Sequence, residues 1–149
     1  MQLNQKETML IADMKGQEKL CIEKYNKAAA SANDTQLKSL FTELSAVEQG
    51  HLKTLCEIES GNPPAPSSGA SQTKTFNAVY SADSPEKQQD SFLCSDLLAT
   101  EKHASSLYDT CVFEFTDQKV RSILNHIQKE EQEHGKAIYD YMKANGMYS

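Results

Sequence analysis

Two Glu-x-x-His motifs, Glu48 to His51 and Glu131 to His134, stand 83 residues apart in the chain. Each motif interrupts a series of apolar residues with helical spacing, so its Glu and His take places where leucine would otherwise pack. Side chains three residues apart lie on the same face of an α-helix. The motifs therefore predict two helices that each turn a carboxylate and an imidazole towards a shared core.

A second pattern repeats with the same offset of 83 residues, from Glu18 to Glu101. Each of these residues precedes the Glu of its Glu-x-x-His motif by 30 residues. Each is also followed seven residues later by a tyrosine, Tyr25 or Tyr108. The chain thus contains an internal repeat of one helical hairpin. For the two tyrosines, hydrogen bonding to the neighbouring carboxylates, electron donation and simple core filling are all open interpretations.

Helix-forming residues and capping signals predict four helices and an all-α fold. The expected helices cover approximately residues 5–31, 35–60, 85–115 and 118–144. No segment shows the alternation of apolar and polar residues that is typical of a strand. The first two form one hairpin, about 5–60, and the last two form another, about 85–144. A flexible linker between two domains is the competing interpretation, but each hairpin is too short to fold alone, so residues 1–149 are interpreted as one domain.

Residues 61–84 begin with a Pro-, Ser- and Gly-rich stretch that predicts an irregular connection. About 24 extended residues can span ~80 Å, whereas a helix of about 27 residues is ~40 Å long. The connection can therefore return along the whole bundle and leave the second and third helices parallel. This predicts a ferritin-like four-helix bundle, in which two antiparallel helical hairpins are joined by one long crossover connection. Within the connection, Phe76, Val79 and Tyr80 are expected to lie against the bundle.

The turn positions predict where the polar residues meet. The midpoint of Glu18 and Glu48 is Asn33, and that of Glu101 and Glu131 is Thr116, both within the expected turns. Residues equidistant from the turn of an antiparallel hairpin lie at the same height, so each hairpin brings two carboxylates and one imidazole to one level. Two stacked hairpins then gather six candidate metal ligands at the bundle centre: Glu18, Glu48, His51, Glu101, Glu131 and His134.

Four buried carboxylates require charge compensation, because desolvation costs several kcal/mol per ion and like charges repel. Two divalent cations would cancel the four negative charges while the imidazoles stay neutral. Mixed oxygen and nitrogen donors suit iron, manganese or zinc better than magnesium or copper(I). We therefore predict two bound iron ions, with manganese or zinc as alternatives. The competing interpretation places the glutamates on solvated helix faces.

Helix geometry assigns solvent-facing positions to four polar residues near the motifs: His103, His126, Glu130 and Glu133. Asp13 and Asp96 point away from the ligand faces, and orientation of a ligand imidazole is their alternative role. The four cysteines are expected to be buried as small hydrophobic residues, with redox activity as the alternative for the one nearest Glu18: Cys21, Cys56, Cys94 and Cys111.

Charge and composition exclude several classes of partner. The 15 basic and 21 acidic residues give a net charge of −6, which argues against nucleic-acid binding driven by bulk charge. No apolar run approaches the ~20 residues that span a membrane, and the N-terminus lacks the features of a signal peptide. No cysteines form a CxxC pair, which excludes a zinc ribbon or a rubredoxin-type iron site built within one chain. A reduced, intracellular setting is the simplest interpretation of the four cysteines. We expect a cytoplasmic protein without nucleic-acid or membrane partners.

The patterns Glu18-x-x-Cys21-x-x-x-Tyr25 and Glu101-x-x-Ala104-x-x-x-Tyr108, each followed by Glu-x-x-His, resemble the ligand helices of rubrerythrin-like and bacterioferritin-like proteins. The resemblance covers all four helices. It implies that Glu18 and Glu101 are terminal ligands, that Glu48 and Glu131 bridge the two metals, and that His51 and His134 each bind one metal. The rubredoxin segment of typical rubrerythrins has no counterpart in these 149 residues.

The second half also resembles the spore coat protein F family, through DLLATEKHASSLYDT (residues 96–110) and IYDYMKANGMY (residues 138–148). This resemblance implies a spore-forming bacterium and a place in or beneath the spore coat, with other coat proteins as partners. The combined expectation is a di-metal oxidoreductase that oxidises Fe(II) or reacts with oxygen or peroxide. The alternative is a structural coat component whose metal stabilises the bundle or is vestigial. A homodimer is the default assembly, and iron storage in a cage ranks lower because no cage-forming fifth helix is evident.

Overall fold

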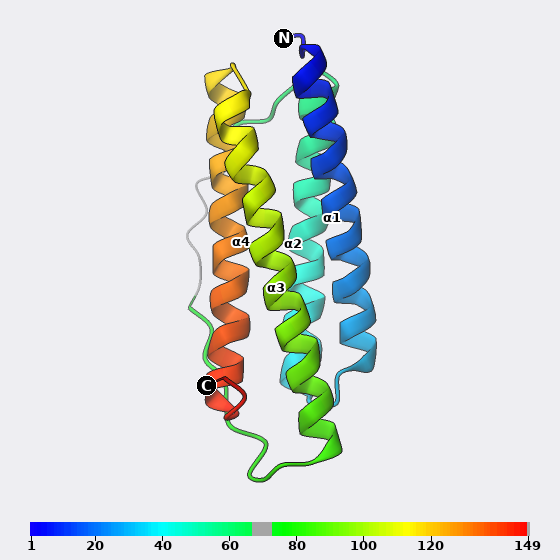
Figure 1. Ribbon diagram of the computed structural model, residues 1–149, viewed down its shortest axis with the longest axis vertical. Helices are drawn as coiled ribbons and strands as arrows, with labels where there is room; N and C mark the ends of the chain where they lie inside the picture. The colour runs from blue at the N-terminus through cyan, green and yellow to red at the C-terminus, as the bar shows by residue number, and fades with distance from the viewer. Residues whose placement is uncertain (67–72, 149) are drawn as a thin grey trace.

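The computed structural model describes residues 1–66 and 73–148 and contains four long helices (Figure 1). They are α1 (Gln5–Ser31), α2 (Thr35–Glu59), α3 (Pro85–Glu114) and α4 (Gln118–Ala144). No strand occurs in the described residues. The all-α fold class is confirmed, and the predicted helix boundaries agree with the observed ones to within one residue.

Side chains cap the N-terminus of every helix, which explains why the boundaries could be predicted. Asn4 and Glu7 form a reciprocal capping box at α1, in which each side chain accepts from the backbone N–H of the other. The side chains of Asp34, Ser84 and Asp117 cap the remaining helices. After α2 and α4 the backbone turns at Gly61 and Gly146, whose φ values of +86° and +64° favour glycine.

The helices form two antiparallel hairpins, α1 with α2 and α3 with α4, which pack side by side (Figure 1). Helix α1 also contacts α3, and α2 contacts α4, so α2 and α3 lie diagonally opposite each other. Both α2 and α3 run in the same direction in Figure 1. The chain therefore leaves α2 at one end of the bundle and enters α3 at the other, which confirms the single crossover connection.

The described end of the connection is attached to the bundle by aromatic and polar contacts. The Phe76 ring packs edge-on against Tyr141 with 5.5 Å between ring centroids. The Tyr80 hydroxyl donates a hydrogen bond of 2.6 Å to Asp90. The expectation for Val79 was wrong, because its side chain is exposed and only its backbone N–H is held, by the Asn145 side chain.

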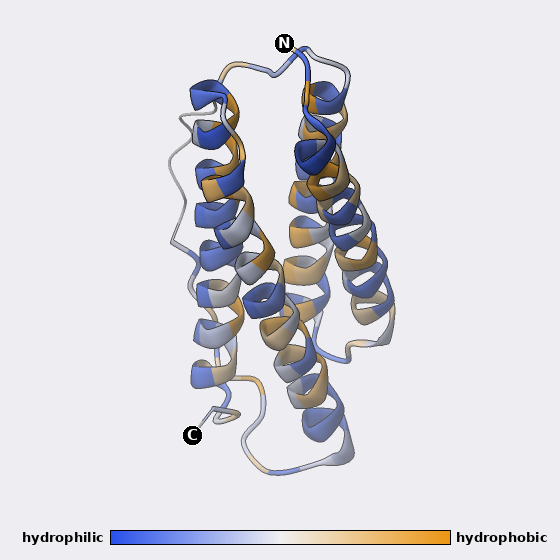
Figure 2. Cartoon of the chain, turned by 45° about the horizontal axis from the view of Figure 1, so that its top comes forward, coloured by the Kyte–Doolittle hydropathy of each residue, from blue (hydrophilic) through white to orange (hydrophobic). Residues whose placement is uncertain are grey.

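The core consists of two apolar clusters with a polar layer between them. One cluster occupies the end with the α1–α2 turn and includes Phe41, Leu97 and Tyr141. The other occupies the end with the α3–α4 turn and includes Met14, Leu55 and Phe115. Figure 2 shows the apolar faces turned towards the other helices and the hydrophilic faces turned outward. The six candidate ligands fall between the two clusters along every helix.

The two hairpins hold each other's turns through matched carboxylates. Glu7 on α1 accepts hydrogen bonds from the backbone N–H and the hydroxyl of Thr116, in the α3–α4 turn. Asp90 on α3 accepts from the backbone N–H groups of Asn33 and Asp34, in the α1–α2 turn. Glu7 and Asp90 differ by 83 positions, as do Asn33 and Thr116. The internal repeat is therefore also a repeat of tertiary contacts, related by an approximate twofold axis.

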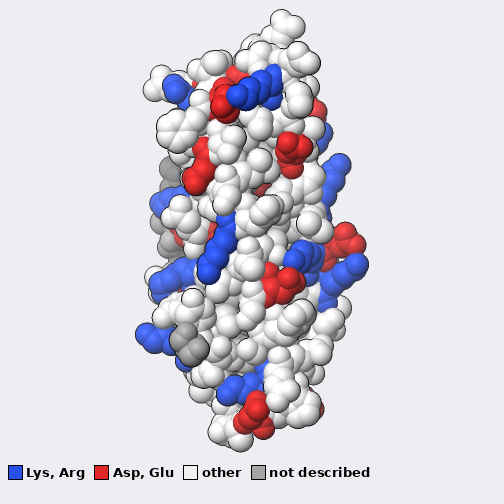
Figure 3. Space-filling view, viewed as in Figure 1, with Lys and Arg blue, Asp and Glu red and all other residues white. Residues whose placement is uncertain are grey.

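The surface carries charges of both signs. On the face shown in Figure 3, lysine and arginine side chains alternate with aspartate and glutamate side chains along the bundle. None of the described helices has an apolar stretch of the kind needed to cross a membrane.

Candidate metal centre

Six polar side chains from all four helices meet at the middle of the bundle. Helices α1 and α3 each supply one glutamate, and α2 and α4 each supply a Glu-x-x-His pair. All six are buried, with at most 5% of any of these residues exposed. The structure thus brings together every residue that the sequence pattern selected, and we call them the six-residue cluster: Glu18, Glu48, His51, Glu101, Glu131 and His134.

The cluster divides into two groups that could each hold a metal ion. One group consists of Glu18, Glu48, His51 and Glu131, and the other of Glu48, Glu101, Glu131 and His134. In each group, one potential ligand atom per residue lies within 4.8 Å of the others. Glu48 and Glu131 belong to both groups. This sharing is the arrangement that two bridging carboxylates would give, with one further glutamate and one histidine for each ion.

Both imidazoles turn Nδ1 towards the carboxylates. His51 Nδ1 lies 3.1 Å from Glu131 Oε1 and 3.4 Å from Glu48 Oε2. His134 Nδ1 lies 2.9 Å from Glu48 Oε1 and 3.3 Å from Glu101 Oε1. The two rings are nearly parallel, 6.0 Å apart between centroids. Each imidazole therefore presents Nδ1 to the shared carboxylate of Glu48 and to a second carboxylate, that of Glu131 for His51 and that of Glu101 for His134.

The contacts within the cluster fit shared cations better than direct hydrogen bonds. Five buried carboxylate oxygens, on Glu18, Glu48, Glu101 and Glu131, have no hydrogen-bond partner among the described residues. They include Glu48 Oε1, although His134 Nδ1 is only 2.9 Å away, because the approach does not have hydrogen-bond geometry. An octahedral ion with bonds of ~2.1 Å places adjacent ligand atoms ~3 Å apart. A cation between the groups would satisfy the unpaired oxygens at these separations.

Without a bound metal, the side chains of the cluster balance their charges by binding protons. Burial raises the pKa of the Glu18 carboxyl to about 8, and burial together with the adjacent Glu101 raises that of Glu131 to about 12. Burial alone would lower the pKa of both imidazoles, but the surrounding carboxylates outweigh it and raise that of His134 to about 9 and that of His51 well above its usual range. The metal-free cluster therefore neutralises itself by retaining protons.

Burial alone would raise the pKa of the Glu48 carboxyl, but the adjacent imidazoles of His134 and His51 outweigh this effect and lower that pKa far below its ordinary value. Glu48 is therefore ionised at neutral pH and supplies a fixed negative charge at the centre of the cluster. A carboxylate shared by two cations needs this state, because a protonated oxygen cannot serve as a metal ligand.

Two tyrosines hold the terminal glutamates of the opposite hairpin. The Tyr25 hydroxyl on α1 donates to Glu101 Oε1 on α3 at 2.5 Å, and the Tyr108 hydroxyl on α3 donates to Glu18 Oε1 on α1 at 2.6 Å. Burial raises the pKa of both tyrosines well above the usual value, so both hydroxyls remain protonated donors. The hydrogen-bonding interpretation therefore describes both side chains, and electron donation stays a prediction.

Glu130 is a contact that the helix-face argument missed. Its carboxylate was expected to face solvent, but Glu130 Oε1 lies 3.0 Å from His51 Nε2 and 3.1 Å from His126 Nε2. The hydrogen bond from His51 and partial burial act in opposite directions, and the net effect lowers the pKa of Glu130. An ionised Glu130 accepts a hydrogen bond from His51 Nε2–H and thereby keeps Nδ1 directed towards the cluster. His126, also expected to face solvent, is only partly exposed for the same reason.

The other polar residues near the motifs have surface roles. Asp96 forms an ion pair with Lys24 at 3.0 Å, and Asp13 is exposed, so neither contacts an imidazole of the cluster.

Three of the four cysteines are buried as expected, but Cys56 is exposed, which corrects the prediction for that residue. Burial raises the pKa of the Cys21 thiol, so this side chain behaves as a small neutral group beside the cluster.

The Coat F domain family matches residues 89–149. The matched segment contains most of α3, all of α4 and the described C-terminal residues. It includes one half of the six-residue cluster, with Glu101, Glu131 and His134, as well as Tyr108. The predicted similarity of the second half to the spore coat F family is thereby confirmed.

No curated protein and no solved structure matches the chain. The similarity to rubrerythrin-like and bacterioferritin-like proteins therefore stays a prediction, which rests on the motifs and their spacing.

Proposed function

We propose that this chain is a spore coat protein that binds two iron ions in the six-residue cluster and catalyses redox chemistry with dioxygen or peroxide. The observation that carries the proposal is the pair of buried groups that share Glu48 and Glu131 and leave five carboxylate oxygens without hydrogen-bond partners. The match of residues 89–149 to the Coat F domain supports the place in the spore coat.

The donor set decides which metals would fit. Four carboxylates and two imidazoles offer hard oxygen and intermediate nitrogen atoms, which suit iron, with manganese and zinc as competitors. Glu18 and His51 would hold one ion, Glu101 and His134 would hold the other, and Glu48 and Glu131 would be shared. Bound iron would supply the one-electron redox steps with dioxygen or peroxide.

The chain itself would position and enclose the ions. Tyr25 and Tyr108 fix one oxygen of each terminal glutamate, and Glu130 fixes the ring orientation of His51. The two apolar clusters above and below exclude water from the layer of charges. Six side chains underfill two octahedral ions, so coordination positions would remain open for a small oxidant.

Metal content gives the first test. Protein purified without added metal, then loaded anaerobically with Fe(II), is expected to bind about two iron ions per chain and to develop a near-UV absorption band on exposure to oxygen. Glu48→Ala and His134→Ala should each abolish paired binding with unchanged helical circular dichroism. Glu23→Ala is a matched control, because Glu23 is exposed on the outer face of α1 and pairs with Lys27. Full metal loading in both cluster variants would show that the site assignment is wrong.

A structural coat component is the second candidate, and the Coat F match is the observation that favours it. In that case the metal would stabilise the bundle without turnover. Spores that lack the gene would then show a disordered coat but ordinary peroxide resistance, and zinc would raise the melting temperature as much as iron does. Loss of peroxide resistance in spores that carry Glu48→Ala, with an intact coat, would favour the redox function instead.

A further inference from the structure

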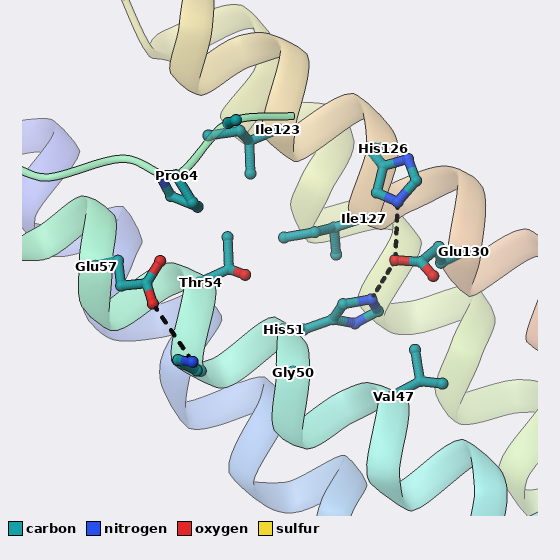
Figure 4. A pocket seen from close by; sticks show the side chains of 12 residues that line it. Val47, Gly50, His51, Thr54, Glu57, Pro64, Ile123, His126, Ile127 and Glu130 are labelled. Atoms are coloured by element: carbon teal, nitrogen blue, oxygen red, sulfur yellow. Dashed lines mark hydrogen bonds and ion pairs between the residues drawn. The ribbon is translucent and has the colours of Figure 1, made fainter. Parts of the chain in front are cut away.

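A pocket of about 480 Å³ lies between α2 and α4, beside the first residues of the connection (Figure 4). Its lining includes His51 of the six-residue cluster, together with His126 and Glu130 of α4. Figure 4 shows the Glu130 carboxylate between the two imidazoles. The pocket therefore reaches from the surface of the bundle to one member of the buried cluster.

Three side chains of the types that can serve as metal ligands follow one another along this pocket. His126 Nε2 lies 3.1 Å from Glu130 Oε1, which in turn lies 3.0 Å from His51 Nε2. The side chains of His126 and Glu130 are 21% and 30% exposed, whereas that of His51 is 5% exposed. Polar ligand atoms thus continue from solvent to the edge of the cluster.

This arrangement occurs in only one of the two repeats. The positions that correspond to His126 and Glu130 in the first hairpin hold Glu43 and Val47. Gly50 lines the pocket, and outside its own helical turn no atom of the described residues lies within 4 Å of the place where a Cβ would be. Glycine costs about 1 kcal/mol relative to alanine inside a helix, and a larger side chain at this position would extend into open space.

Two further depressions touch the cluster. One is lined by His134 and by the lysines Lys74 and Lys136. The other lies on the α3–α4 side and is lined by Glu101, Glu131 and Gly135 and by the lysines Lys102 and Lys136. Among the described residues, the α2–α4 pocket beside Gly50 is lined by one lysine, Lys53, and by the carboxylates of Glu57 and Glu130. A divalent cation would therefore meet fewer positive charges in this pocket.

We propose that divalent cations enter the six-residue cluster through the pocket between α2 and α4, with His126 and Glu130 as a transient outer site. This inference rests on the proposed function, because it assumes that the cluster binds metal. An imidazole and a carboxylate four residues apart lie on the same side of a helix and can bind one cation together. Two protein ligands hold an ion loosely, so it can pass on to His51 and the shared carboxylates.

The test is the rate of Zn²⁺ uptake by the full chain, measured in a stopped-flow instrument with a fluorescent zinc indicator. Gly50→Leu fills the α2–α4 pocket, and its Cβ has open space, so the helix should fold normally. Gly135→Leu is the matched control for the α3–α4 depression: it copies Leu52, the corresponding residue of the first hairpin, and its Cβ would make an ordinary contact of 3.5 Å with Leu98. His126→Gln removes the outer imidazole without filling the pocket.

Gly50→Leu is expected to slow uptake by about tenfold or more, and His126→Gln by a few-fold, whereas Gly135→Leu leaves the rate unchanged. All three variants should still reach two Zn²⁺ per chain at equilibrium. A wild-type rate in Gly50→Leu, or an equal slowing in Gly135→Leu, would overturn the entry route while leaving the metal site intact. Absence of Zn²⁺ uptake by the wild-type protein would instead overturn the proposed function and the entry route with it.

Discussion

The Tyr25 hydroxyl donates a hydrogen bond of 2.5 Å to Glu101, and 83 positions later Tyr108 donates one of 2.6 Å to Glu18. Each tyrosine thus supports the carboxylate of the other hairpin, next to the shared glutamates. The same exchange occurs at the ends of the bundle between Glu7 and Thr116 and between Asp90 and Asn33. The hairpins are therefore joined by reciprocal polar contacts as well as by apolar packing.

Removal of either tyrosine hydroxyl should weaken the metal-free bundle. Tyr25→Phe removes the hydrogen bond of 2.5 Å to Glu101 in a buried layer, and Tyr108→Phe removes that of 2.6 Å to Glu18. Each change is expected to lower the free energy of unfolding by about 1–3 kcal/mol, measured by urea denaturation. Tyr139→Phe serves as the control, because Tyr139 is half-buried and its ring packs edge-on against Tyr148. Equal effects in all three variants would argue against a specific role for the two hydroxyls.

Glu7 predicts an acid-dependent loss of stability. Burial alone would raise the pKa of its carboxyl, but hydrogen bonds from Thr116 and Asn4 outweigh it and lower that pKa below 4.5. A lowered folded-state pKa contributes stability that is present above the unfolded-state value and is lost as pH falls through the folded-state value. Glu7→Gln should therefore cost about 1–2 kcal/mol at pH 7 and progressively less below pH 4.5, measured by denaturant titrations across that range. A cost that did not change with pH would contradict this account.

The cluster predicts the opposite pH dependence for the metal-free protein. The folded-state pKa values of Glu18, about 8, and His134, about 9, are raised from 4.5 and 6.5, so the folded chain holds protons that the unfolded chain releases. The contribution of these two groups to stability should therefore be fully present below their unfolded-state pKa values and decline as pH rises through about 8 and 9. With bound Zn²⁺ this decline should disappear, because cations replace the protons. Thermal melts from pH 6 to 9, with Zn²⁺ and with a chelator, would show whether the two curves diverge.

The contact between Glu130 and His51 predicts that the two metal positions differ in affinity. His134 has Val47 in the corresponding place, so its Nε2 lacks the carboxylate that orients His51. Val47→Glu should tighten the weaker of two sequential Zn²⁺ binding steps by about tenfold, and Glu130→Val should weaken the tighter step by about tenfold, both measured by calorimetry. If the wild-type protein binds two Zn²⁺ ions with one affinity and Glu130→Val leaves it unchanged, Glu130 has no such role.

Local signals were sufficient to predict the helices and the level of the cluster. Asp34 and Asp117 mark helix starts unambiguously, and equal distances from the turns place Glu18 beside Glu48 and Glu101 beside Glu131. These relations follow from helix and hairpin geometry alone. The pairing of glutamates within a hairpin does not depend on how the two hairpins are oriented. The repetition of the motifs then predicts that the ligands of the two hairpins meet.

Contacts of residues outside the ligand faces of the helices could not be predicted in the same way. Glu130 is next to Glu131 in the helix, so its direction differs by about 100° from the cluster face, and a helical wheel places it outside. Its carboxylate nevertheless reaches His51 because α2 passes close to α4 on that side. The exposed position of Val79 depends on how Phe76 and Tyr80 anchor the segment, which hydropathy does not specify. Such outcomes require the packing of helices from both hairpins.

The exchange of Glu7 and Asp90 between hairpins has a consequence for how this architecture could arise and change. One hairpin contains a donor and an acceptor for every exchanged contact, so two copies of the same hairpin would satisfy each other completely. The molecule has the form of a symmetric pair of identical subunits that a peptide segment has fused into a single polypeptide. In a single polypeptide each half can change independently. Val47 and Glu130 differ at equivalent positions, as do Gly50 and Glu133, whereas two identical subunits would carry the same residue at both positions.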